Sequence, residues 1–266
     1  MTIIEAKDRF KKATSMIKIS RTSVEQNIKC PRCFVLDKKH KIKPFSLPFT
    51  LNIAVDELCK NEFDYYRAKA EPHPLFIEHG IDAVPFAHEQ LDDWRDWRKG
   101  IRTIDEENGI NFGGAIDDVW QKSTGELIVA DVKATAKKVF DWEKTCAEYD
   151  YPKSYQRQLE MYQYLLKKNG FEVAPEAYLV YYNGRKNEPM FNQEMKFDLH
   201  LIKVDCDFSW VDQAILDTKK SLEGPMPKST PTSTVVVTDK TSISVTKSRC
   251  SSSAVSIPLK CLCLRP

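Results

Sequence analysis

The residues best suited to chemistry in this sequence are two aspartates and a lysine, Asp117, Asp131 and Lys133. Asp131 and Lys133 stand one residue apart near the end of the apolar run 127–135, and residues i and i+2 of a strand point to the same face. A polar turn over 122–126 precedes this run, so a hairpin can bring Asp117 beside Asp131. Two facing carboxylates repel each other and favour a cation between them. Oxygen ligands of this type suit Mg²⁺ or Mn²⁺.

Such a centre would support attack of water on a phosphate ester. A bound divalent ion lowers the pKa of a water and offsets charge on a phosphoryl oxygen. Lys133 would orient or help to deprotonate that water, or stabilise the charged transition state. The alternative is that Asp131 and Lys133 form a plain ion pair at the surface end of a strand, because a three-residue pattern recurs by chance.

Two predicted helices could contribute further side chains. Asp56 and Lys60 are four residues apart on a helix predicted over 50–70, where they either face the sheet or form a solvent-side pair. Gln158 and Tyr162 have the same spacing on a later helix, where they either line the cleft or lie at the edge of the core.

The hydrophobic periodicity of the chain predicts a mixed α/β domain, in which helices flank a mixed central β-sheet. We expect helices over 20–30, 50–70, 89–99, 154–168 and 210–222, and strands over 111–121, 127–135, 177–182 and 196–204. Residues 71–88 contain three prolines and are predicted to form a loop, as are the lysines and prolines of 38–48.

Composition divides the 266 residues into a basic N-terminal arm (1–16), a domain (17–228) and a tail (229–266). The tail has 15 Ser or Thr and neither aromatic residues nor glycine, so we expect it to be disordered. Residues 1–44 carry a net charge of +8, against +2 for the whole chain. This basic region could bind nucleic-acid phosphates, or it could be a solvated lysine-rich surface.

The sequence also bears on the protein's compartment and on its cysteines. No apolar run approaches the length of a membrane span, and charges interrupt the N-terminus, so an intracellular, cytoplasmic protein is expected. The eight cysteines are then interpreted as thiols or metal ligands rather than as a disulfide framework. Cys30 and Cys33 form a Cys-x-x-Cys pair, which is half of a tetrahedral metal site.

Three ordered motifs resemble the PD-(D/E)XK nuclease superfamily, in particular its branch of RecB-type and CRISPR-associated exonucleases. The motifs are Gly114-Ala-Ile-Asp117, Val129-Ala-Asp-Val-Lys133 and Gln158-Leu-Glu-Met-Tyr162, which resemble the family's G-x-(I/V)-D, (V/I)-x-D-x-K and Q-x-x-x-Y. Cys30-Pro-Arg-Cys-Phe34 also resembles the box that opens many of these domains. The resemblance covers roughly residues 17–228.

The resemblance implies a restriction-endonuclease-like core and metal-dependent cleavage of DNA, at single strands or ends, in repair, recombination or processing of foreign DNA. The roles that it implies are metal ligation by Asp117, by Asp131 and by the carbonyl of Val132, catalysis by Lys133, and substrate contact by Gln158 and Tyr162. Asp56 occupies the position at which the family has a histidine, and an aspartate can still ligate a hard cation.

The sequence of the tail departs from the pattern of the family. Relatives commonly end with a Cys-x-x-Cys box, which can hold an iron–sulfur cluster or zinc together with the N-terminal cysteine. This chain offers only Cys250, Cys261 and Cys263 there. A complete cluster with Cys30 and Cys33 as ligands is therefore not expected.

Two rival hypotheses stay open. In one, the nuclease fold is retained without turnover, and the basic arm with Trp94, Trp97 and Tyr155 binds nucleic acid. In the other, the chain is a structural or interaction protein, and the acidic residues of its domain only form a solvated surface.

Overall fold

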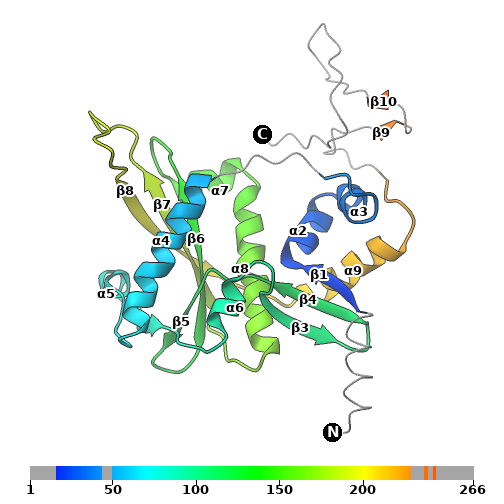
Figure 1. The fold of residues 1–266 in the computed structure, drawn as a ribbon, viewed down its shortest axis with the longest axis horizontal. Coiled ribbons are helices and arrows are strands. Elements are labelled where there is room, and N and C mark those ends of the chain that lie inside the picture. Colours follow the sequence, from blue (N-terminus) through cyan, green and yellow to red (C-terminus); the bar gives the residue numbers. More distant parts are fainter. Residues whose placement is uncertain (1–15, 44–49, 229–236, 239–241, 244–266) are drawn as a thin grey trace, which may run out of the picture. The chain divides into compact units, whose positions relative to one another are not determined.

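The computed structural model describes residues 16–43, 50–228, 237–238 and 242–243 (Figure 1). These residues divide into two compact units. The first comprises 16–21 and 50–211, and the second comprises 22–43 and the described residues from 212 onward. The basic arm predicted over 1–16 and the tail predicted from 229 lie outside the described residues, apart from Met16 and two short strands that pair antiparallel, β9 (Val237–Thr238) and β10 (Ser242–Ile243).

A five-stranded mixed sheet forms the centre of the first unit, as the sequence predicts. In spatial order its strands are β2 (Ala83–Pro85), β5 (Asp118–Lys122), β6 (Leu127–Thr135), β7 (Glu176–Gly184) and β8 (Phe197–Asp205). Only β6 and β7 run parallel. The predicted hairpin is confirmed, because β5 and β6 pair antiparallel with Asp118 opposite Ala130.

Two long helices, α4 (Thr50–Arg67) and α8 (Tyr151–Lys168), cover β6 (Figure 1). Phe63 of α4 packs in one buried cluster with Ala130 and Val132. Residues alternate between the faces of a strand, so Asp131 points the other way, where Gln158 of α8 contacts it. This double coverage explains the near-continuous apolar run of β6 and makes its single buried carboxylate conspicuous.

The strand predicted over 111–121 is in fact two strands that belong to different sheets. β4 (Ile110–Gly114) joins β1 (Ile17–Ser20) and β3 (Ile101–Asp105) in a three-stranded sheet, whereas β5 begins only at Asp118. A Cβ added at Gly114 would lie 2.9 Å from Cε1 of the Tyr162 ring. A glycine is therefore needed where the chain passes Tyr162 and turns to place Asp117.

Several short helices and strands are not predicted from the sequence. The proline-containing loop predicted over 71–88 contains α5 (Pro74–His79) and the edge strand β2. Pro74 begins α5 because a helix tolerates proline in its first turn, and Gly80 ends it with φ of 64°. Two further helices of this unit are α6 (Leu91–Arg95), within the predicted 89–99, and α7 (Trp142–Glu148), which was not predicted.

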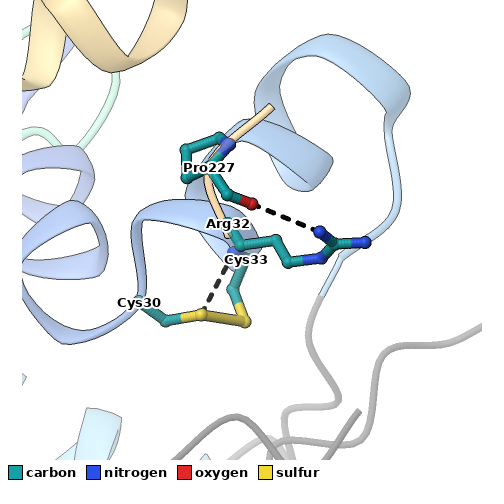
Figure 2. The surroundings of a disulfide bond; sticks show 4 residues. All are labelled: Cys30, Arg32, Cys33 and Pro227. Carbon is teal, nitrogen blue, oxygen red and sulfur yellow. Dashed lines mark hydrogen bonds between the residues drawn. A yellow bond between two sulfur atoms is a disulfide. The ribbon is translucent and has the colours of Figure 1, made fainter. Parts of the chain in front are cut away.

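The second unit contains α3 (Pro31–His40) and most of α2 (Arg21–Lys29) and α9 (Val211–Glu223). The helices predicted over 20–30 and 210–222 correspond to α2 and α9. Helix α3 was not predicted, and its last three residues fall within the loop predicted over 38–48. Arg32 donates to the carbonyl of Pro227 at 3.2 Å (Figure 2). In the described part of the chain, no helix is both long and apolar enough to cross a membrane.

Candidate metal centre

The hairpin brings Asp117, Asp131 and Lys133 together. The backbone N–H of Val132 donates to Oδ2 of Asp117 at 3.0 Å, which fixes this carboxylate against β6. Asp131 is fully buried and forms an ion pair with Lys133, whose side chain is 17% exposed. The shared face that strand geometry predicts for Asp131 and Lys133 is therefore present, and Asp117 lies beside them.

The electrostatics of this group favour an added positive charge. Burial raises the pKa of Asp131 to about 7; the ammonium of Lys133 opposes this rise and the nearby carboxylate of Asp117 adds to it. Burial would lower the pKa of Lys133, but attraction to Asp131 and Asp117 outweighs that effect and raises it. The buried carboxylate of Asp131 thus pairs with Lys133, and the carboxylate of Asp117 adds a second negative charge nearby.

Asp56 lies at the edge of the same group, and not on a solvent-side face. Lys60 Nζ is 2.6 Å from Asp56 Oδ2 and 4.0 Å from Asp117 Oδ1. The other oxygen of Asp56, Oδ1, is buried and has no hydrogen-bond partner. Burial, together with the charge of Asp117, raises the pKa of Asp56. Asp56 is therefore the third carboxylate of this group, and its Oδ1 atom is a buried acceptor without a hydrogen-bond donor.

Gln158 and Tyr162 face this group from α8. The side-chain amide nitrogen of Gln158 donates to Asp131 Oδ1 at 2.6 Å and to the hydroxyl of Tyr162 at 3.2 Å. Its amide oxygen accepts from Lys133 at 3.5 Å. Both side chains are buried. Gln158 therefore bridges the aspartate and the lysine, and Tyr162 supports it from one turn further along.

These donors suit a hard divalent cation that keeps part of its water shell. Mg²⁺ is commonly held by one or two carboxylates and several waters. Asp117 and Asp131 offer two such carboxylates, and the unsatisfied oxygen of Asp56 is an additional acceptor. No three His, Cys, Asp or Glu side chains of the described residues converge closely enough to form a ligand cluster of their own. The residues therefore fit a divalent cation that retains water ligands better than one that is enclosed by protein ligands alone.

A buried ion-pair network behind Asp117 was not predicted. Asp118 is 1% exposed and pairs with Arg67 at 2.5 Å and with Arg95 at 2.8 Å. Arg95 also donates from Nε to the main-chain carbonyl of Asp117 at 3.2 Å. One signal was available in the sequence: Asp118 shares a strand face with the core residue Trp120, and a carboxylate there requires a cationic partner.

The cysteine predictions need correction. Cys30 and Cys33 were candidates for a half-site of thiol ligands, but the structure joins them in a disulfide at the start of α3 (Figure 2). Their spacing of three residues at the first turn of a helix brings the Cα atoms to 5.3 Å. A disulfide offers no thiolate to a metal. Cys250, Cys261 and Cys263 lie outside the described residues.

The aromatic residues of the binding hypothesis are placed differently from one another. Trp94 is buried and stacks on His88 with ring centroids 4.5 Å apart, so it is a core residue. Trp97 is 84% exposed. Tyr155 lies at the centre itself, with Lys133 Nζ 4.7 Å from its ring centroid.

Comparison with known proteins gives a family match over most of the predicted domain. The sequence profile described as the PD-(D/E)XK nuclease superfamily matches residues 48–224, which include Asp56, the hairpin and α8. No curated protein matches the chain. One solved structure, the crystal structure of LHK-Exo in complex with dAMP, is 13% identical, covers 79% of this chain and 86% of its own, and has a TM-score of 0.28. A likeness that distant carries no argument about this site.

Proposed function

The chain belongs to the PD-(D/E)XK nuclease superfamily, and from this premise we propose that it is a divalent-metal-dependent deoxyribonuclease that hydrolyses phosphodiester bonds at its Asp117–Asp131–Lys133 centre. The observation that carries the proposal is the convergence of two carboxylates and a lysine at β6, the middle strand of the central sheet, with Asp117 held by the Val132 amide. Processing of single strands or DNA ends, in repair, recombination or defence against foreign DNA, is the role we assign to it.

The residues divide the work as follows. Asp117, Asp131 and the Val132 carbonyl would hold Mg²⁺ or Mn²⁺, and Asp56 would supply a further acceptor oxygen. When bound, the ion supplies acidity for the attacking water and offsets charge on the phosphoryl oxygen. Lys133 orients that water and stabilises the negative charge that develops at phosphorus. Water forms the new P–O bond, the P–O bond to the leaving nucleotide breaks, and the leaving oxygen takes up a proton.

Gln158 acts on this chemistry through its neighbours. Because its amide contacts both Asp131 and Lys133, it holds the carboxylate and the ammonium in one orientation. Tyr162 limits the movement of Gln158 and packs against the glycine that precedes Asp117. Because both side chains are buried, we assign them the role of positioning the centre rather than direct contact with a bound strand.

The test is a cleavage assay with Mg²⁺ or Mn²⁺ on single-stranded, duplex and forked DNA. The purified wild-type protein should cleave at least one substrate, and EDTA should abolish cleavage. Asp131→Asn should remove activity while the circular dichroism spectrum stays that of the wild type. Full activity of the folded Asp131→Asn protein would overturn the proposal.

A second candidate function is nucleic-acid binding on a retained nuclease fold without turnover. The observation that favours it is the Asp56–Lys60 ion pair, which places the positive charge of a lysine against one carboxylate of the centre. This function predicts salt-sensitive DNA binding and no cleavage with any divalent ion. The same cleavage assay separates the two functions. If the wild type does not cleave DNA but Lys60→Ala does, Lys60 is the residue that blocks the centre.

A further inference from the structure

A cavity of about 320 Å³ opens beside Lys133, between the end of β6, α7 and the start of α8. Five aromatic side chains line it: Phe140, Trp142, Tyr151, Tyr155 and Tyr181. We call it the aromatic pocket. Its volume falls at the lower end of the range of about 300–1,000 Å³ that is usual for small-molecule sites.

The rings of the aromatic pocket support one another. Phe140 and Trp142 both pack against Tyr181, with centroid distances of 5.1 and 5.6 Å. On α8, Tyr151 meets Tyr155 edge-on at 5.4 Å. Tyr181 is buried, whereas the other four are only partly covered. The pocket therefore has aromatic walls that are packed in place and still present accessible ring surface.

The charge of the aromatic pocket is positive. Lys137 extends its ammonium to Thr145 Oγ1 at 2.6 Å and to the hydroxyl of Tyr151 at 3.1 Å. Among the described residues no carboxylate pairs with Lys137, and no Asp or Glu lines the pocket. The backbone of Lys137 is fixed as well, since its N–H donates to Asn183 Oδ1 at 2.8 Å. Lys133 also lines the pocket, but its ammonium is already paired with Asp131, so the uncompensated positive charge is that of Lys137.

Aromatic faces with a fixed ammonium group match the two halves of a nucleotide. A nucleobase stacks on aromatic rings without regard to its identity, and a phosphate is attracted to lysine. A base within a duplex already has both faces stacked and its pairing edge occupied, so it cannot enter such a pocket without being unpaired. The chemistry of the pocket thus selects an unpaired base.

We propose that the aromatic pocket binds the unpaired nucleobase of the nucleotide adjacent to the scissile phosphate, and that Lys137 contacts the neighbouring phosphate. This inference rests on the proposed nuclease function and deepens it, because it names the side chains that would select the single strands and DNA ends proposed above. A blunt duplex has no such base to offer.

The test measures binding rather than cleavage. A fluorescent single-stranded oligonucleotide is titrated with the full chain in EDTA, and the series is repeated with oligonucleotides that carry one abasic residue at successive positions. We expect one position at which loss of the base weakens wild-type binding by about tenfold, within the range for one stacked base. Equal binding of the intact and all abasic oligonucleotides would overturn the proposal.

Variants then locate that base. Trp142→Ala should bind the intact oligonucleotide about as weakly as the wild type binds the abasic one. The abasic substitution should not weaken binding to this variant further, because both changes remove the same contact between base and ring. Trp142→Phe keeps a ring and should retain most of the affinity, which separates stacking from misfolding. Tyr65→Ala removes an exposed tyrosine of α4 that does not line the pocket and should bind as the wild type does.

The outcomes keep the two proposals apart. If the wild-type protein shows the abasic effect and Trp142 accounts for it, but no divalent ion supports cleavage, the nuclease proposal fails and the base pocket stands as a binding site. If the protein cleaves DNA, but Trp142→Ala retains the full abasic effect, the nuclease proposal stands and the pocket proposal fails.

Discussion

Gln158 of α8 donates to Asp131 Oδ1 at 2.6 Å, and the two residues are 27 positions apart in the chain. This bond links the helix motif Gln158-x-x-x-Tyr162 to the strand motif Asp131-x-Lys133. Each motif alone is too short to be specific, but the two contribute side chains to one site. Because Asp131 is fully buried, Gln158 is one of the few groups able to orient its carboxylate.

Replacing Gln158 should therefore impair the centre without unfolding the protein. Partners that hold a metal ligand typically contribute 10- to 100-fold to metal affinity or activity. We expect Gln158→Ala to lower kcat/KM and Mn²⁺ affinity by about that factor. Gln156→Ala alters an exposed glutamine on the same helix and serves as the control. Unchanged Mn²⁺ affinity and rate in Gln158→Ala would show that the hydrogen bond is not needed.

A methyl group at Gly114 should disturb the same centre from the other side. The added Cβ would lie 2.9 Å from the buried Tyr162 ring and 3.1 Å from Arg21 Cβ, so the ring or the strand has to shift. Overpacking of this kind costs about 1–3 kcal/mol of unfolding free energy. Gly184→Ala is the matched control, because its nearest contacts begin at 3.6 Å. Urea unfolding measures both variants, and equal midpoints would contradict the close approach.

Removing Arg95 should destabilise the fold. Arg95→Ala takes one of the two guanidinium groups from the buried Asp118 and leaves that charge undercompensated. Loss of one partner from a buried ion pair costs about 3–5 kcal/mol. Arg98→Ala breaks an ion pair with Asp96 that is open to solvent and should leave the urea midpoint unchanged. A midpoint for Arg95→Ala within error of the wild type would contradict this account of the network.

His73 should make the stability of the domain sensitive to acid. Its Nδ1 accepts from the Leu75 N–H at 3.1 Å, which caps α5, and its Nε2 lies 3.2 Å from Glu62, so the ring is neutral with its proton on Nε2. Burial lowers the pKa of His73 below its ordinary 6.5 despite the attraction of Glu62. The unfolded chain therefore binds this proton first, and the free energy of unfolding falls as the pH drops below about 6.5.

The measurement is the change in Tm between about pH 7.5 and about pH 5.5, where histidine titrates. His73→Asn keeps a capping oxygen but cannot titrate. We expect the wild type to lose more Tm than the variant over this interval. Equal losses in the two proteins would assign the acid sensitivity to other groups.

Long amphipathic elements were the most predictable part of the fold. A stripe of apolar residues that spans several turns sets the position of a helix, so α4 and α8 were predicted within about three residues at each end. The strand β1 was missed because it depends on pairing with β4, some ninety residues later in the chain, and local periodicity carries no signal of that kind. Helix α5 was missed because the three prolines of 71–88 were interpreted as helix breakers, whereas Pro74 begins the helix.

The candidate site was predictable where its residues fall in short motifs and unpredictable where they come from separate elements. Asp117, Asp131, Lys133 and Gln158 each carry a local pattern, and the hairpin and α8 bring them together. Arg67 and Arg95 contribute from α4 and α6, and nothing in their local sequence indicates a shared carboxylate. The aromatic pocket is likewise assembled from β6, β7, α7 and α8.

The measurement that bears most directly on the central claim is the single-turnover rate of cleavage of single-stranded DNA in Mg²⁺, compared between the wild type, Lys133→Ala and Lys138→Ala. Lys138 is an exposed lysine five residues further along and provides the matched control. If the centre acts as proposed, the wild type and Lys138→Ala cleave at similar rates, and Lys133→Ala is slower by about 100-fold or more. Equal rates for the wild type and a correctly folded Lys133→Ala would contradict the account.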